Sequence, residues 1–139
     1  MKNGIRQGSI LSPHFFNVYV DELNYALSNS RVGCHLADKP MNNLSYADDL
    51  VLIAPSTSAL NELLQICQSF ASEHYIIFSI TKSVCMRILP KQMKLKNCPT
   101  VYLGENKLQF VNDFNYLGHT ITSDFSDDKD ILKEMRKLY

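Results

Sequence analysis

Apolar residues recur at helical spacing in two stretches of this chain. The first stretch follows Pro13, which suits a helix start because its missing amide proton has no helical partner there. This stretch predicts a helix over about residues 14–28. Ser56 or Ser58 is placed to cap a second helix. The expected buried positions are Phe16, Val20, Leu23 and Leu27 in the first helix, and Leu60, Leu63, Leu64, Cys67, Phe70 and Ala71 in the second.

Shorter apolar runs, bounded by turn-forming residues, predict strands. The expected strands cover residues 50–53, 75–79, 84–89, 101–103, 108–111 and 115–122. Residues 104–107 predict a hairpin turn between two of them. A last helix is expected after Ser126, because acids suit its positive end and bases its other end. That simple capping role is preferred over a second metal site for Asp127, Asp128 and Asp130. Strands and helices in this order indicate an α+β fold.

Composition narrows the class of protein. The 139 residues suit one domain, and 45% hydrophobic with 20% charged residues is ordinary for a globular protein. Lys+Arg and Asp+Glu balance at 14 each, so any nucleic-acid binding depends on a local groove rather than on a basic total charge. No signal peptide or membrane-spanning run is recognisable, which predicts an intracellular protein of the nucleus or cytoplasm. The expected reduced, structural thiols are Cys34, Cys67, Cys85 and Cys98.

The strongest chemical signal is the stretch Tyr46-Ala47-Asp48-Asp49, which precedes the apolar run of residues 50–53. The pattern predicts a tight hairpin with both acids at its tip. Adjacent carboxylates repel each other, so keeping both ionised calls for a cation or strong hydrogen bonds. Hard cations such as Mg²⁺ take oxygen ligands and commonly bridge to phosphates. The alternative is a solvated turn, in which Asp suits the backbone and water screens its charge.

The order of motifs resembles the palm of reverse transcriptases. The chain runs from Gly4-Ile5-Arg6-Gln7-Gly8 through Ser12-Pro13 to the Tyr-Ala-Asp-Asp stretch at residues 46–49. Residues 78–83, ending Thr-Lys-Ser, resemble the fourth palm block, although Ser79 stands where asparagine is common. Residues 114–118 resemble the Tyr-Leu-Gly block before the thumb. An arginine at the position of Arg6 resembles the loop of non-LTR (LINE-type) retrotransposon enzymes. Group II intron enzymes, the nearer alternative, usually have proline at that position.

The resemblance implies a partial palm, an antiparallel sheet with helices on one face, over residues 1–111. A primer-contacting strand and the start of the thumb helix would occupy residues 112–139. It also implies nucleotidyl transfer, in which a primer 3′-hydroxyl attacks the α-phosphate of a deoxynucleotide and pyrophosphate leaves. Two Mg²⁺ ions would stabilise the attacking and leaving oxygens. RNA template, DNA primer and deoxynucleotides would be the partners, with no membrane involved.

The same resemblance assigns roles to individual residues. Asp48 would be the direct metal ligand, and Asp49 a supporting catalytic and metal residue near the primer end. Lys82 would assist the leaving pyrophosphate, although an exposed turn lysine is an equal alternative. Gly4 and Gly8 would let the backbone approach template and nucleotide. The remaining expected contacts are Arg6, Gln7, Tyr46 and Ala47 for nucleotide or template, and Tyr116 and Gly118 for primer.

One catalytic group of the family lacks a counterpart here. Reverse transcriptases use a further aspartate from a strand before the loop that corresponds to Gly4-Ile5-Arg6-Gln7-Gly8. In this sequence, only three residues precede Gly4, and none of them is acidic. Asp21 does not substitute easily, because it is expected on the following helix. The sequence therefore predicts a truncated reverse-transcriptase segment that is inactive by itself. The alternatives are a non-enzymatic remnant that binds nucleic acid or a partner, and an unrelated α/β domain with a chance Asp-Asp turn.

Overall fold

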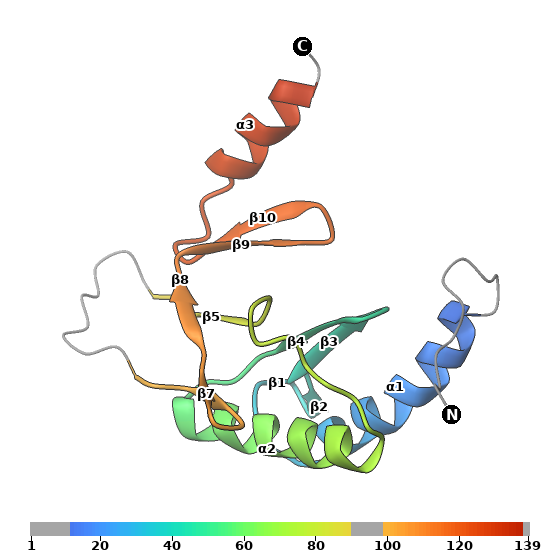
Figure 1. The fold of residues 1–139 in the computed structure, drawn as a ribbon. Helices are drawn as coiled ribbons and strands as arrows, with labels where there is room; N and C mark the ends of the chain where they lie inside the picture. The colour runs from blue at the N-terminus through green and yellow to red at the C-terminus, as the bar shows by residue number, and fades with distance from the viewer. Residues whose placement is uncertain (1–11, 90–98, 138–139) are drawn as a thin grey trace. The chain divides into compact units, whose positions relative to one another are not determined.

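The computed structural model describes residues 12–89 and 99–137, with side chains from residue 20 onward. The chain divides after Ile77 into two compact units. The first unit holds two helices and two short antiparallel hairpins (Figure 1). Its elements are α1 (Ser12–Asn29), β1 (His35–Leu36), β2 (Lys39–Pro40), β3 (Asn43–Tyr46), β4 (Asp49–Leu52) and α2 (Thr57–Glu73).

The two expected helices of the first unit are confirmed, and α1 packs against both α2 and β3. Ser56 is the N-cap of α2, where its hydroxyl accepts a hydrogen bond from the Ala59 amide at 3.2 Å. Leu27 of α1 and Leu63 of α2 are both 0% exposed. Burial of each such leucine contributes about 1.5–3 kcal/mol to folding. The buried face of α2 consists of Leu63, Leu64, Cys67, Phe70 and Ala71, so Leu60, which is only half-buried, is the one expected member outside it.

Cys67 is expected to be chemically inert in the folded chain. Its side chain lies in the α2 core, and burial raises the pKa of its thiol to about 12. The thiolate is the reactive form, so N-ethylmaleimide at pH 8 should label Cys67 only after unfolding in urea, whereas half-buried Cys34 should react sooner. Peptide mass spectrometry measures both. Equal labelling rates of Cys67 in native and unfolded protein would contradict its placement in the core.

The second unit consists of short strand pairs and one helix. β5 (Val84–Met86) pairs in parallel with β8 (Gln109–Val111), and the other two pairs are antiparallel hairpins. Leu89 donates its amide proton to the Ser123 carbonyl, and this hydrogen bond joins the segment after β5 to the end of the last hairpin. The remaining elements are β6 (Tyr102–Leu103), β7 (Asn106–Lys107), β9 (Asp113–Tyr116), β10 (His119–Thr122) and α3 (Asp128–Lys137).

Three strand predictions were wrong in detail. Residues 75–79 form no strand: Tyr75 has a left-handed φ of 55° after the end of α2, and its side chain is 95% exposed. A hairpin was expected between residues 101–103 and 108–111. Instead, Leu103 pairs with Asn106 across a two-residue turn that begins at Gly104, whose φ is 64°. Strand β8 pairs with β5. The single strand expected over residues 115–122 is instead the hairpin β9–β10.

The expected α+β class is confirmed at the level of mixed helices and strands. The strands were expected to form a partial antiparallel sheet with helices on one face; in the described part of the chain they form five separate two-stranded sheets, four antiparallel and one parallel. The last helix begins at Asp128, two residues after the expected cap Ser126, whose hydroxyl accepts a hydrogen bond from the Asp128 amide. Within residues 12–89 and 99–137, no helix is long and apolar enough to cross a membrane.

Candidate functional site

The Asp-Asp stretch forms the predicted hairpin in the first unit. β3 and β4 pair antiparallel, with Tyr46 opposite Asp49, so Ala47 and Asp48 are the two central turn residues. Ala47 has a φ of 50°. A positive φ at this position belongs to the primed turns, whose twist matches that of the flanking strands. The turn therefore projects Asp48 at the tip and starts β4 with Asp49.

Both carboxylates are exposed, and Tyr46 beside them is 63% exposed. The opposite end of the hairpin is more enclosed, since Leu50 to Ile53 are half-buried. Two neighbouring carboxylates offer the oxygen ligands that suit Mg²⁺. In the part of the chain that the structure describes, no group of three or more His, Cys, Asp or Glu side chains could hold a metal. The carboxylate oxygens of Asp48 and Asp49 are therefore suitable ligands for Mg²⁺. Within the described residues, they form only part of a complete ligand set.

Asn42, which sequence reasoning missed, anchors the base of this hairpin. Its side chain is 0% exposed. The amide nitrogen donates to the carbonyl of Leu27 at 2.6 Å and to that of Val32 at 2.7 Å, while its oxygen accepts from Asn43. Its own backbone carbonyl accepts from the Ile53 amide at 2.8 Å. One buried amide thus joins the end of α1, the following connector and the hairpin.

Gly33 allows the connector after α1 to lie close against Asn42 and Ile53. It has a φ of 96°, and a Cβ placed there would lie 2.5 Å from the Asn42 Cβ and 2.9 Å from the Ile53 carbonyl oxygen. Only glycine combines this left-handed backbone with the missing side chain. A second tie runs higher on the hairpin, where the Asn24 amide nitrogen of α1 donates to the Ser45 hydroxyl at 2.8 Å. These contacts fix the hairpin to α1.

Of the other predicted site residues, Tyr46 and Ala47 belong to this hairpin. Lys82 is exposed, in a turn closed by hydrogen bonds from the Lys82 and Ser83 amides to the Ser79 carbonyl. It belongs to the second unit, whereas Asp48 and Asp49 belong to the first. The predicted template and nucleotide residues Gly4, Arg6, Gln7 and Gly8 lie outside the described residues.

Tyr116 and Gly118 belong to the β9–β10 hairpin of the second unit. Tyr116 pairs with His119 across a turn made by Leu117 and Gly118. Their φ angles are 49° and 89°, so both central residues are left-handed, as in a type I′ turn. A Cβ on Gly118 would meet no other atom within 4 Å. Gly118 is therefore required by its backbone conformation, and the space around it remains open.

Comparison with known proteins identifies the class to which these elements belong. The family model described as "Reverse transcriptase (RNA-dependent DNA polymerase)" matches residues 1–121. This chain belongs to the reverse transcriptase family.

The similar curated proteins come from non-LTR retrotransposons, as the sequence predicted. The chain is 28% identical over 128 residues to the R2DM polyprotein of Drosophila melanogaster, covering 86% of this chain and 12% of that protein. It is 29% identical over 131 residues to an R2 polyprotein of Popillia japonica, covering 88% of this chain and 21% of that one. The RNA-directed DNA polymerase from mobile element jockey of Drosophila funebris is 26% identical over 121 residues, covering 83% and 12%.

The chain thus spans 12% to 21% of the length of these curated relatives. No solved structure matches it significantly.

Proposed function

We propose that this chain is the later palm and the start of the thumb of an RNA-directed DNA polymerase from a non-LTR retrotransposon. The observation that carries the proposal is the placement of two adjacent, exposed carboxylates at the end of a hairpin, one on its two-residue turn and one at the start of β4, in a chain of this family. The R2 and jockey relatives favour a non-LTR parent over a group II intron parent. RNA template, DNA primer and deoxynucleotides are the partners that follow from this assignment.

The hairpin would hold the metal ions of the reaction. Asp48, at the tip of the turn, is the proposed direct ligand of Mg²⁺, and Asp49 is the neighbouring support. When bound, the ions supply charge stabilisation for the oxygens that attack and leave during nucleotidyl transfer. Tyr46 and Ala47 would shape the surface beside the nucleotide. The hydrogen bonds of Asn42 hold the base of this hairpin on the end of α1 and on the connector after it, which favours a preorganised hairpin.

The second unit would contact the primer. Tyr116 and Gly118 lie on the β9–β10 hairpin, and the open space beside the Gly118 α-carbon would admit a nucleic-acid strand. Lys82 is exposed and is assigned to the leaving pyrophosphate. Gly4, Arg6, Gln7 and Gly8 remain the proposed template and nucleotide contacts.

The proposal is tested by transplanting the segment into a relative. In the jockey polymerase of Drosophila funebris, which is similar to this chain over 121 residues, all 139 residues of this chain would replace the corresponding segment. The chimera is expected to extend a DNA primer on an RNA template, in a reaction that requires Mg²⁺ and deoxynucleotides. A soluble, monodisperse chimera that binds primer–template as its host does, yet never extends the primer, would contradict the proposal.

The isolated chain provides a second measurement, which does not depend on the chimera. Paramagnetic Mn²⁺, used as a probe for the Mg²⁺ site, is expected to broaden the amide signals of residues 46–50 before those of the rest of the chain. Because two carboxylates supply few ligands, we expect weak binding and no primer extension by these 139 residues alone. Uniform broadening over many surface acids would contradict a specific site. Salt-sensitive binding of primer–template without metal-dependent signals at the hairpin would favour a binding remnant instead.

A further inference from the structure

Helix α3 attaches to the β9–β10 hairpin through polar contacts. α3 contacts β10, yet none of its described residues is buried. Its large apolar side chains Ile131, Leu132 and Met135 are all at least half exposed. Hydrophobic burial therefore contributes little to this attachment. Hydrogen bonds and ion pairs from one face of the helix must supply its geometry.

Asp130 covers the outer edge of β10. In a two-residue hairpin, the residues that flank the turn form a hydrogen-bonded pair, so the next pair, Asn115 and Thr120, directs its amide protons outward. Asp130 takes up that free donor, since its carboxylate accepts the Thr120 amide proton at 2.7 Å. The other carboxylate oxygen lies 2.9 Å from Nδ1 of His119. The Asp130 side chain is only 21% exposed, although its partner His119 is 71% exposed.

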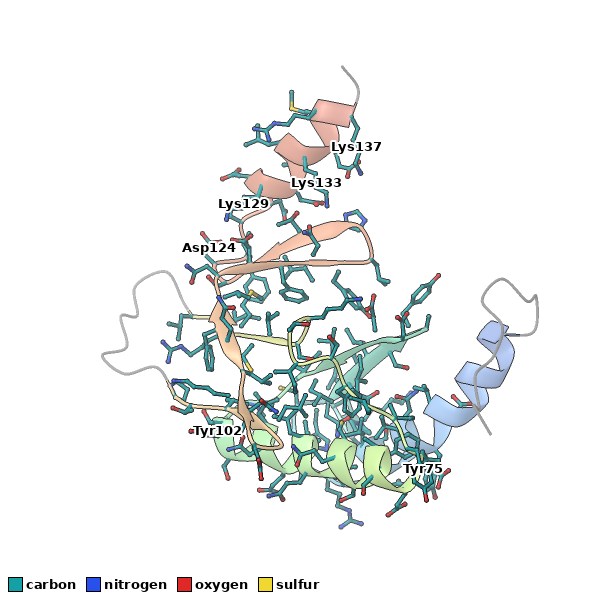
Figure 2. All side chains as sticks on the ribbon, viewed as in Figure 1. Tyr75, Tyr102, Asp124, Lys129, Lys133 and Lys137 are labelled. Atoms are coloured by element: carbon teal, nitrogen blue, oxygen red, sulfur yellow. The ribbon has the colours of Figure 1, made fainter. Side chains whose placement is uncertain are left out.

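Lys133 holds the turn itself. One helical turn beyond Asp130, its ammonium donates to the Gly118 carbonyl at 2.7 Å and to Oδ1 of Asn115 at 3.1 Å. The Thr120 hydroxyl donates to the same Asn115 oxygen at 3.0 Å. Lys129, earlier on the same helix, pairs with Asp113 near the open end of the hairpin. Figure 2 shows Lys129 and Lys133 in succession along α3. Lys129, Asp130 and Lys133 thus attach α3 to the β9–β10 hairpin at several positions along its length.

The Asp130 and Lys133 contacts converge on a strained turn. Leu117 is a γ-branched residue with a φ of 49°, a conformation that residues other than glycine rarely adopt. Such residues persist where the surrounding structure over-determines them. Here, Asp130 binds the residues directly after the turn, and Lys133 binds the carbonyl of its second central residue.

We infer that Asp130 and Lys133 are positioning residues, which hold the Leu117–Gly118 turn in its type I′ form and align α3 with it. The two residues are called the α3 clasp. This role rests on the proposed function, in which the β9–β10 hairpin contacts the primer: the clasp then determines where that contact lies. Neither residue needs to touch the reacting atoms. It makes the approach angle of the thumb helix depend on polar groups rather than on a packed core.

The first test observes the turn in the full chain by amide NMR. Asp130→Ala is expected to move the Thr120 amide signal upfield and to speed its hydrogen exchange roughly tenfold or more, as loss of a hydrogen bond to a charged acceptor implies. Lys133→Met should shift the Gly118 and His119 amides, and Lys133→Arg should restore part of the effect. Asp130→Asn retains one acceptor oxygen and should fall between wild type and Asp130→Ala.

Two variants on the same helix provide matched controls. Glu134 and Lys137 pair with each other on α3, and within the described residues no hydrogen bond or ion pair joins either of them to the β9–β10 hairpin. Glu134→Gln and Lys137→Met should therefore leave the signals of residues 116–120 in place. Unchanged Thr120 and Gly118 signals in Asp130→Ala and Lys133→Met, with a folded spectrum for the rest of the chain, would overturn the clasp. Equal shifts in the control variants would also overturn it.

The pH dependence gives a signature that a merely structural residue would lack. Hydrogen bonds from His119 and from the Thr120 amide, with the nearby Lys133 charge, lower the pKa of Asp130 below its ordinary value of 3.8. Among the described residues, the charged groups at this contact between α3 and the hairpin are Asp113, Lys129, Asp130 and Lys133, and His119 is the further titratable group there. The Thr120 shift should follow Asp130, with a midpoint below 3.8. A midpoint at or above that value would contradict the contact.

The second test connects the clasp to the primer. In the chimera with the jockey polymerase, Asp130→Ala should raise the KM for primer–template about tenfold, while the KM for deoxynucleotide and the Mg²⁺ requirement stay near the parent values. An unchanged KM beside altered NMR signals would overturn the positioning role. A chimera that never extends primer would count against the proposed function instead, and the NMR result on the chain would then decide the clasp alone.

Discussion

Asp48→Asn is expected to lower primer extension by the chimera at least about 100-fold, the range typical of losing one charge-stabilising group at a catalytic centre. The substitution preserves the shape of the side chain but removes the negative charge at the tip of the β3–β4 turn. Asp49→Asn should have the smaller effect, because Asp49 is assigned the supporting role. In the isolated chain, Asp48→Asn should also abolish selective Mn²⁺ broadening at residues 46–50.

The chain contains a matched control for this substitution. Ala37 and Asp38 form the turn between β1 and β2, and Ala37 has a φ of 52°, close to the 50° of Ala47. The two turns share an Ala-Asp pair, but Lys39 follows the first and Asp49 follows the second. Asp38→Asn should therefore leave extension and Mn²⁺ broadening unchanged.

Neither substitution should alter stability by more than about 0.5 kcal/mol, since both side chains are exposed. Urea denaturation checks that condition. Retention of extension in Asp48→Asn would remove this residue from the metal site.

Asn42→Asp is expected to produce the largest loss of stability, about 2–6 kcal/mol at pH 7. The replacement has the same shape, but the Leu27 and Val32 carbonyls each lose a buried donor, at about 1–3 kcal/mol per unsatisfied group. The new carboxylate also faces those two carbonyl oxygens without water. Asn106→Asp, at an exposed position of the short strand β7, should change stability by less than about 0.5 kcal/mol.

The Asn42→Asp deficit should shrink as the pH falls. Burial beside carbonyl oxygens raises the pKa of a carboxyl group, because it disfavours the charged form. A group whose folded pKa is raised loses its favourable contribution as pH rises through that value, so the variant should be least stable at high pH. Urea unfolding of wild type and variant at pH 5 and pH 8 measures the difference. A deficit that is the same at both values, or larger at pH 5, would contradict the buried contact.

The Asp-Asp hairpin was predictable because its information is local. Two acids next to an apolar run of four residues already predict a turn followed by a half-buried strand, and register follows from the two-residue loop. The first two helices were predictable for a similar reason, since their buried faces repeat at helical spacing. The order of motifs also indicated the reverse transcriptase family, which the match over residues 1–121 bears out.

The supports of the site were not visible in the sequence. Asn42 reads as one more polar residue in a connector, and its burial depends on two carbonyls from segments 10 and 15 residues earlier. Gly33 carried a signal, because glycine often marks a positive φ, but its neighbour Asn42 did not. Asp130 lies in the first turn of its own helix, as expected, and its carboxylate also accepts a hydrogen bond from the Thr120 amide, which was not expected. That partner became available only when β9 and β10 folded into a hairpin.

From the sequence alone come the family, the α+β class, the helices and the pair of carboxylates, because each of these depends on residue type and short-range spacing. The tertiary structure decided how the strands pair, which polar groups are buried, and what holds each hairpin to its helix. Those outcomes depend on donors and acceptors that are distant in the chain. A buried or edge amide must find whichever partner the fold brings within hydrogen-bonding distance.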